Sequence, residues 1–305
     1  MDVVSIITTF YNSQDYILKC LDSINKQVTD EFFKIEYVLI DDCSTDDSVK
    51  IVKLFFDNYL NKESNIEYKL ISTPNNLGCG GARNFGIKNS SGNFLMFLDA
   101  DDYYIHNDFV KRAYWNIVEH NADIVEYGLK YINQNGEREN LVSNKTFVIN
   151  DNPIGNLSVM FYDNLIKFMP WTKIIRRPIV ETKSYDTSRT FEDIRTTPYW
   201  VYNAKKIIIT NTIEINYRAA AKSIIRENPN DTRLGTVAAI CSLFEDFKDN
   251  KDILKAMYDR CLVDLRTMIH CNYESEYFKE MSKLNTKMLS YIYPNDYQNM
   301  TYNIE

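Results

Sequence analysis

The chain has 305 residues, of which 45% are hydrophobic and 25% are charged, and its formal net charge is −7. This length accommodates one large domain or two, with a substantial buried core. The negative charge argues against broad nucleic-acid binding, which requires basic residues to neutralise phosphates. The six cysteines and three histidines are scattered, with no Cys-x-x-Cys pair, and this spacing argues against a zinc site.

The first 130 residues or so alternate strand and helix patterns. Strands are predicted at 3–7, 35–40, 67–72 and 93–98, and helical spacing is found at 17–24, at 49–56 and after a glycine-rich turn. Such alternation predicts parallel βαβ units. Ligands of parallel sheets bind beyond the carboxyl ends of the strands. Polar clusters follow three of the strands, at 9–12, 41–46 and 99–102, so we expect them to converge on one rim of the sheet.

After residue 132 the pattern changes. Asn135-Gly136 is typical of a hairpin turn between strands at 130–132 and 141–142. A helix is predicted at 156–168 and short strands at 207–209 and 212–217. From about residue 231 the chain is mostly helical, with segments at 234–248, 252–270 and 275–291. These helices are interpreted as an appendage whose packing surface is a candidate homodimer interface.

The most informative segment is Asp99-Ala100-Asp101-Asp102, which follows the apolar run 94–98. An isolated ionised carboxylate is costly to bury, so such a cluster is solvated, paired or neutralised by a cation. Mg²⁺ or Mn²⁺ binds carboxylate oxygens and completes its coordination with water and substrate phosphates. The alternative is a solvated acidic turn that caps a helix beginning near Asn107.

Two further motifs carry chemistry. The loop 75–84 is rich in glycine and precedes a short helix, but Arg83 stands where a dinucleotide-binding fingerprint has its third glycine. Arg83 is therefore interpreted as a donor to a phosphate or base, with an ordinary surface arginine as the alternative. Glu192-Asp193 precedes a predicted helix at 194–202, where the acids serve either as a general base or to offset the helix dipole.

Together these segments resemble family 2 of the glycosyltransferases, which have the GT-A fold. The matching segments are 5–12, 40–46, 76–78 with 82–84, 97–102 and 191–193, followed by the less specific 171–177 and 216–218. The resemblance implies an α/β fold with a Rossmann-like, mostly parallel central sheet flanked by helices. It implies a domain over residues 1–220, with a nucleotide-sugar-binding half at 1–105 and an acceptor-binding half at 106–220. Residues 221–305 form a helical C-terminal region outside it.

The resemblance also implies roles for single residues. Thr9, Tyr11 and Asp42 face the nucleobase, Arg83 contacts the base or diphosphate, Asp99 lies near the ribose, Asp101 binds Mn²⁺ or Mg²⁺, and Asp193 is the catalytic base. A second group of candidates comprises Glu192, Asp102, Asp41, Arg218 and Lys222, of which the last two are candidates for holding the diphosphate. The sequence departs from the family at Cys43, where a small residue such as glycine is usual, and it has no histidine near 215–225.

The function implied is an inverting, metal-dependent transfer of a sugar from a UDP-sugar to a hydroxyl of a glycan, either a bacterial surface polysaccharide or a lipid-linked oligosaccharide. Two alternatives remain open. One is a non-catalytic sugar-nucleotide-binding or assembly protein. The other is a nucleotidyltransferase, which would carry a basic glycine-rich loop after the first strand, where this chain has residues 9–12.

The sequence begins without a secretory leader, and no apolar run approaches the roughly 20 residues of a membrane span. We therefore expect a cytoplasmic protein with reduced cysteines, and not a processive or dolichyl-phosphate-type synthase. Peripheral contact with the inner face of the cell membrane is a further candidate, through Lys173, Arg176, Arg177 and the tyrosine-rich C-terminal helices. Solvated basic and aromatic faces are the alternative for those segments.

Overall fold

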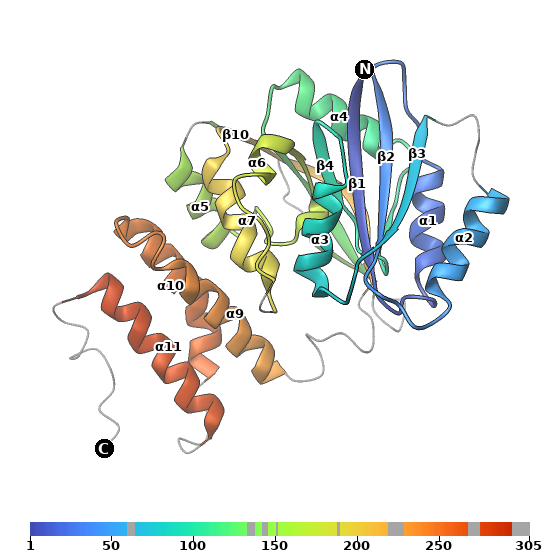
Figure 1. Ribbon diagram of the computed structural model, residues 1–305. Coiled ribbons are helices and arrows are strands. Elements are labelled where there is room, and N and C mark those ends of the chain that lie inside the picture. Colours follow the sequence, from blue (N-terminus) through green and yellow to red (C-terminus); the bar gives the residue numbers. More distant parts are fainter. Residues whose placement is uncertain are drawn as a thin grey trace.

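A computed structural model describes residues 1–59, 65–132, 138–141, 146–150, 152–187, 190–218, 229–267 and 275–294. Its strands form one sheet in the order β3-β2-β1-β4-β9-β6-β10-β5, with β7 beside β6 and β8 beside β10. Helices cover both faces of this sheet (Figure 1). The arrangement confirms the predicted α/β class.

The first half of the sheet is parallel. Its strands are β1 (Asp2–Phe10), β2 (Phe33–Asp41), β3 (Ile66–Ser72) and β4 (Phe94–Phe97). They alternate with α1 (Ile17–Asn25), α2 (Ser48–Tyr59) and α3 (Gly78–Lys88). Because consecutive strands run parallel, their carboxyl ends share one edge, as the pairs Phe10–Asp41 and Ile7–Phe97 show. The predicted βαβ units and their common rim are therefore confirmed.

The second half is mixed. β9 (Lys173–Arg176) lies antiparallel between β4 and β6 (Ile124–Ile132), and β10 (Lys206–Arg218) runs parallel to β6. The short strands β5 (Tyr103–Tyr104), β7 (Arg138–Leu141) and β8 (Phe147–Asn150) are antiparallel to their neighbours. β10 is one continuous strand where two short strands were predicted. Its pairing with β6 shifts register across the polar residues 210–212, but the strand does not end there. The Asn135-Gly136 turn lies outside the described residues.

Two apolar layers enclose the sheet. The layer on one face joins the strands to α1, α2 and α4 (Phe109–Glu119), and Ile6 points into it. The other joins them to α3, α5 (Pro153–Phe161), α6 (Arg177–Val180) and α7 (Glu192–Asn203), and Ile7 points into it. Alternating side chains of one strand thus bury both faces. α5 ends before the predicted residue 168, and the 3-10 turn Pro170–Thr172 leads into β9.

The C-terminal helices continue the second layer. α9 (Pro229–Leu243), α10 (Lys251–Leu265) and α11 (Glu276–Ile292) lie beyond α5 and α7 (Figure 1). Val237, Met257 and Met281 belong to the same buried cluster as Ile7, so the apolar core runs unbroken from the sheet into these helices. The division at residue 220 stays a prediction.

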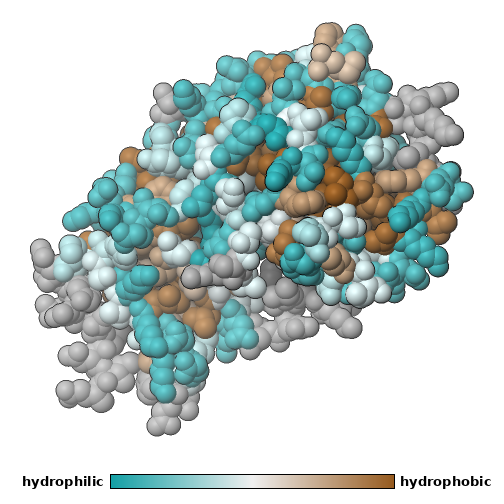
Figure 2. Space-filling view, viewed as in Figure 1, coloured by the Kyte–Doolittle hydropathy of each residue, from teal (hydrophilic) through white to brown (hydrophobic). Residues whose placement is uncertain are grey.

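Hydrophobic residues reach the surface around the sheet beside α3 (Figure 2). β3 is the edge strand on that side, and most of its residues are only partly buried. Within the described residues, no helix has both the length and the apolar character to cross a membrane.

A buried glutamate links the strands of the parallel half of the sheet to one another. Glu36 on β2 is 1% exposed and accepts hydrogen bonds from Lys69 Nζ (2.5 Å), Ser91 N (2.8 Å) and Ser5 Oγ. Ser5 Oγ in turn accepts from Gly92 N at 2.8 Å. Burial by itself would raise the pKa of Glu36, but these bonds outweigh it and lower the pKa to about 2. The network ties β1, β2 and β3 to the turn that leads into β4.

Replacing Glu36 with glutamine is expected to lower the free energy of unfolding by about 2 kcal/mol at pH 7, the scale of hydrogen bonds to a buried charge. The pKa of Glu36 is lower in the folded protein, so its contribution is complete above the ordinary pKa of 4.5 and is lost as pH falls toward 2. Urea denaturation of Glu36→Gln and Glu67→Gln would measure it, since the Glu67 side chain is 48% exposed and its ion pairs are weak. Equal effects of the two substitutions would contradict this account.

Candidate active site

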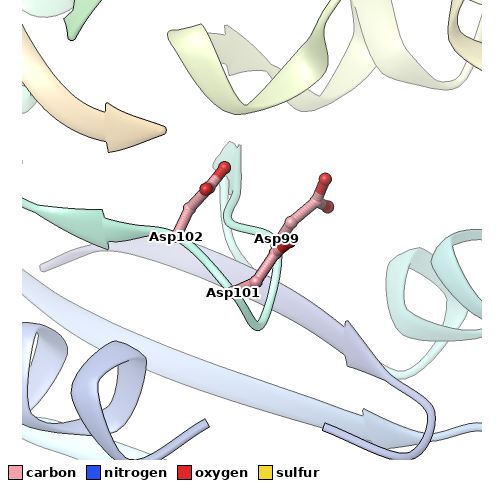
Figure 3. Close-up of side chains that lie close together, drawn as sticks. All are labelled: Asp99, Asp101 and Asp102. Atoms are coloured by element: carbon pink, nitrogen blue, oxygen red, sulfur yellow. The ribbon is translucent and has the colours of Figure 1, made fainter. Parts of the chain in front are cut away.

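An acidic loop follows β4 at the common rim. One carboxylate oxygen each of Asp99, Asp101 and Asp102 lies within 4.8 Å of the others, and Figure 3 shows Asp99 and Asp102 projecting to the same side of the loop. Asp102 is fully buried. Its Oδ1 accepts from Arg218 N at 2.8 Å, and its Oδ2 has no hydrogen-bond partner in the described part of the chain. The predicted acidic cluster is therefore present at the end of β4.

The electrostatics of this loop fit a divalent cation. Burial, and then the charge of Asp99, raise the pKa of Asp101 to about 6. Burial and both neighbouring carboxylates raise the pKa of Asp102 well above its ordinary value. A hard divalent cation would offset this repulsion and bind the unpartnered Asp102 Oδ2, because it prefers carboxylate oxygens.

Asp42, just after β2, holds the loop before α3. Its Oδ1 accepts from Leu77 N and Thr73 Oγ1, each at 2.8 Å, and its Oδ2 accepts from Gly78 N at 2.9 Å. Gly78 has a φ of 71°, a conformation that favours glycine. Both Asp42 oxygens are thus engaged by the protein, and the nucleobase contact expected from the sequence stays a prediction.

Other candidates lie along the same rim. Tyr11 is 50% exposed beyond β1, and Thr9 at the end of β1 is partly exposed. Asp41 has a local role, because its carboxylate accepts from Ser44 N (2.9 Å) and Ser72 Oγ (3.1 Å). Cys43 has a φ of 66°, a left-handed conformation that glycine adopts without strain, which gives a physical reason for the glycine that the family resemblance led us to expect there.

Arg83 on α3 connects the acidic loop to the start of α7. It is 3% exposed, and its Nη2 donates to Asp99 Oδ1 at 2.8 Å while its Nη1 donates to Glu192 Oε1 at 2.6 Å. The rings of Tyr185 and Trp171 lie 5.4 and 5.9 Å from its Cζ. The structure thus places a buried guanidinium between two carboxylates, and the expected contact with a base or diphosphate stays a prediction.

The glycines near Arg83 make room for protein atoms. A Cβ at Gly80 would lie 2.5 Å from the Asp186 carbonyl oxygen and 3.3 Å from Glu192 Cβ. α3 therefore packs directly against the segment that carries Glu192. The sequence interpretation missed this contact, because residues 80 and 192 are remote in the chain.

Asp193 lies in the first turn of α7, where its Oδ1 accepts from Ile194 N at 2.8 Å. Burial, and then the charge of Glu192, raise the pKa of Asp193 to about 6, although Arg83 opposes the rise. A carboxylate with such a pKa accepts a proton near neutral pH more readily than an ordinary aspartate does.

The remaining basic candidates have structural partners. Lys173 is fully buried and lies 2.7 Å from Glu126 Oε2, so the expectation that it meets a membrane surface is wrong. Arg177 Nε donates to the Gly92 carbonyl at 2.5 Å. Glu126 and Lys173 are opposite each other on β6 and β9. Opposite charges within two apolar strands are the signal that could have revealed this pair.

Three aromatic side chains near the acidic loop had no assigned role in the sequence interpretation. Trp171 stacks on Tyr217 with ring centres 5.9 Å apart, and Tyr185 packs against Arg83. Arg218 lies with its Cζ 5.0 Å from the centre of the Tyr16 ring. Lys222 is outside the described residues.

The family model for glycosyl transferase family 2 matches residues 5–182, more than half of the chain. The chain belongs to this family. The match includes the acidic loop and Arg83, whereas α7 with Asp193 and the C-terminal helices lie beyond it.

Among curated relatives, the glycosyltransferase GlyA of Streptococcus pneumoniae is 39% identical over 40% of this chain and 16% of its own length. The poly(ribitol-phosphate) β-N-acetylglucosaminyltransferase TarS of Staphylococcus aureus is 38% identical over 43% of this chain and 22% of its own. The matched part of this chain thus spans less than a quarter of either relative.

Solved structures agree on the fold. TarS 1–349 in complex with UDP-GlcNAc superposes with a TM-score of 0.73 at 20% identity, over 96% of this chain and 82% of that chain. The mannosyltransferase PcManGT of Pyrobaculum calidifontis, in complex with GDP-Man and Mn²⁺, superposes with a TM-score of 0.59 at 14% identity, over 96% and 87%. The fold of this family 2 chain is therefore the GT-A fold, as predicted.

Proposed function

We propose that this family 2 chain is an inverting, metal-dependent glycosyltransferase that moves a sugar from a UDP-sugar to an acceptor hydroxyl. The observation that carries the proposal is the bridge made by Arg83, which joins the acidic loop to the start of α7. It brings a carboxylate cluster suited to a cation close to Asp193, whose pKa is about 6. These are the two groups that the reaction needs, a site for the diphosphate and a base for the acceptor.

In this proposal Asp101 and Asp102 hold Mn²⁺ or Mg²⁺, with Asp99 beside them. A cation held there would act as a Lewis acid and stabilise the charge of the departing diphosphate. Thr9 and Tyr11 bind the nucleobase at the rim, and Arg83 keeps Asp99 and Glu192 in fixed positions. Because Arg83 holds these two carboxylates in the absence of a substrate, little reorganisation of them is needed when charge develops.

Asp193 accepts the proton of the attacking hydroxyl. A base that activates the acceptor on the face opposite the leaving diphosphate gives inversion at the anomeric carbon. The names of TarS and of a Bacillus relative, a poly(ribitol-phosphate) β-glucosyltransferase that is 37% identical over 44% of this chain, favour a bacterial surface polymer as the acceptor. UDP-GlcNAc and UDP-glucose are accordingly the first donors to test.

The experiment incubates the protein with Mn²⁺ and single UDP-sugars, with and without poly(ribitol phosphate), and measures released UDP. Release with one donor that requires the metal would support the proposal. Tight UDP binding without turnover, with or without acceptor, would favour the alternative of a non-catalytic binding protein. A nucleotidyltransferase would instead release pyrophosphate from a nucleoside triphosphate.

The pH dependence of turnover tests the assignment of Asp193. The active form is the deprotonated one, and with a pKa of about 6 this form falls to about one tenth at pH 5. We expect kcat at saturating donor, acceptor and Mn²⁺ to be constant above pH 7 and about tenfold lower at pH 5. UDP affinity measured over the same range separates loss of the base from loss of the metal. A kcat that stays flat down to pH 5 would rule out a base with this pKa.

A further inference from the structure

We propose that α9 positions Asp193 by packing against the side chain of Phe191, and that Gly235 is the residue that allows this close packing. The inference rests on the proposed role of Asp193 as the catalytic base. It assigns a role to a helix outside the segment matched by the family model. α9, the first of the C-terminal helices, packs against α7 (Figure 1).

Gly235 brings the backbone of α9 against the ring of Phe191. A Cβ at residue 235 would overlap that ring, 2.7 Å from Cδ2 and 2.9 Å from Cζ. Any other residue at this position would push the ring away. Within a helix, glycine is less favourable than alanine. Gly235 therefore lowers the stability of α9 while it allows this close approach.

Phe191 has a backbone conformation that its surroundings must maintain. It is the N-cap residue of α7 with a φ of 62° and a ψ of 40°, in the left-handed region, and it makes no side-chain cap hydrogen bond. Bulky residues avoid this region unless packing holds them there. Glu192 and Asp193 follow directly, so the direction in which their side chains leave α7 depends on Phe191 staying in place.

Two further side chains of α7 form hydrogen bonds with α9 or with the turn that follows it. Arg195 Nη1 donates to Ser242 Oγ on α9 at 2.5 Å, and the Tyr199 hydroxyl donates to Asp246 in the turn after α9. Residues 191, 195 and 199 are spaced four apart and therefore lie on one face of α7. This face of α7 therefore packs against α9 and the turn after it, beginning at the end of α7 that carries Asp193.

Displacing the Phe191 ring should therefore misplace Asp193 while leaving the nucleotide rim intact. A misplacement of about 1 Å in a catalytic group costs up to about 100-fold in rate. For Gly235→Ala we expect kcat to fall about 10- to 100-fold, with UDP affinity in the presence of Mn²⁺ changed less than threefold. Amide exchange across residues 190–196 should become faster, because the left-handed N-cap loses its support.

Gly155→Ala is the matched control. A Cβ at Gly155 would also crowd a side chain, 2.5 Å from Asn152 Nδ2, but at the start of α5. α5 binds the other end of α7, where Asn156 Nδ2 donates to the carbonyls of Val201 and Ala204. This variant should lose stability and keep its kcat. The double variant Gly235→Ala/Phe191→Leu, with a smaller side chain at 191, should regain at least threefold of the lost kcat.

The experiment measures kcat, UDP binding by calorimetry and amide exchange by mass spectrometry for the wild type and these three variants. Equal effects of Gly235→Ala and Gly155→Ala, or unchanged exchange at 190–196 in Gly235→Ala, would overturn the inference. If the wild type turns over no donor, the proposed function is wrong. If Asp193→Asn is fully active, Asp193 is not the base, and a change of kcat in Gly235→Ala would not report on its position. Exchange at 190–196 then decides by itself whether Gly235 positions this segment.

Discussion

Asp193→Asn is expected to lower kcat about 10²- to 10⁴-fold, the range over which a positioned general base contributes. Asparagine has nearly the same shape, so it keeps the hydrogen bond from Ile194 N but cannot accept the acceptor's proton. UDP affinity should change little, because Asp193 lies on α7 and the proposed nucleotide site lies at the ends of β1 and β4. The residual activity should also lose its decline below pH 6.

The matched control is Asp252→Asn, an exposed acid in the first turn of α10. If Asp193 only offsets a helix dipole, both substitutions will cost a few tenths of a kcal/mol in stability and neither will affect turnover. A fully active Asp193→Asn protein would exclude this residue as the base.

Asp101→Asn should have two opposite effects. Metal-dependent UDP binding should weaken at least 10- to 100-fold, because even residues that only support metal ligands change metal affinity by this factor. Without metal, however, the variant should melt at a higher temperature than the wild type at pH 7. The pKa of Asp101 is raised in the folded protein, so its ionised form destabilises the fold at pH 7, and asparagine removes that charge.

Calorimetric titration of UDP with and without Mn²⁺, together with thermal melts in a chelator, would measure both effects. Asp22→Asn serves as the control, since the Asp22 side chain is 48% exposed and forms an ion pair with Lys26 on the surface of α1. Unchanged UDP binding in Asp101→Asn would contradict the metal-site assignment. A lower melting temperature in the chelator would contradict the account of repulsion within the acidic loop.

Much of the fold was predictable because its signals are local. The continuous apolar strands, the helical spacing between them and the polar residues after each strand predicted the parallel half and its rim. β9 was harder to predict, because it is the antiparallel strand between β4 and β6 and it comes from residues 173–176, far from both in the chain. The pairing of distant strands depends on packing that periodicity does not record.

In the candidate site, too, some features follow from the local sequence and others depend on the tertiary structure. The sequence alone determined that acidic residues stand at the end of β4 and at the start of α7, since residue type and element ends are local properties. Only the tertiary structure decided the partners of Arg83, because Asp99 is 16 residues away and Glu192 is 109 residues away. It also decided that Lys173 is buried against Glu126 and that Gly235 lies against the ring of Phe191. A charge or a glycine has the same local pattern in either environment, and its role is set by the atoms that folding brings against it.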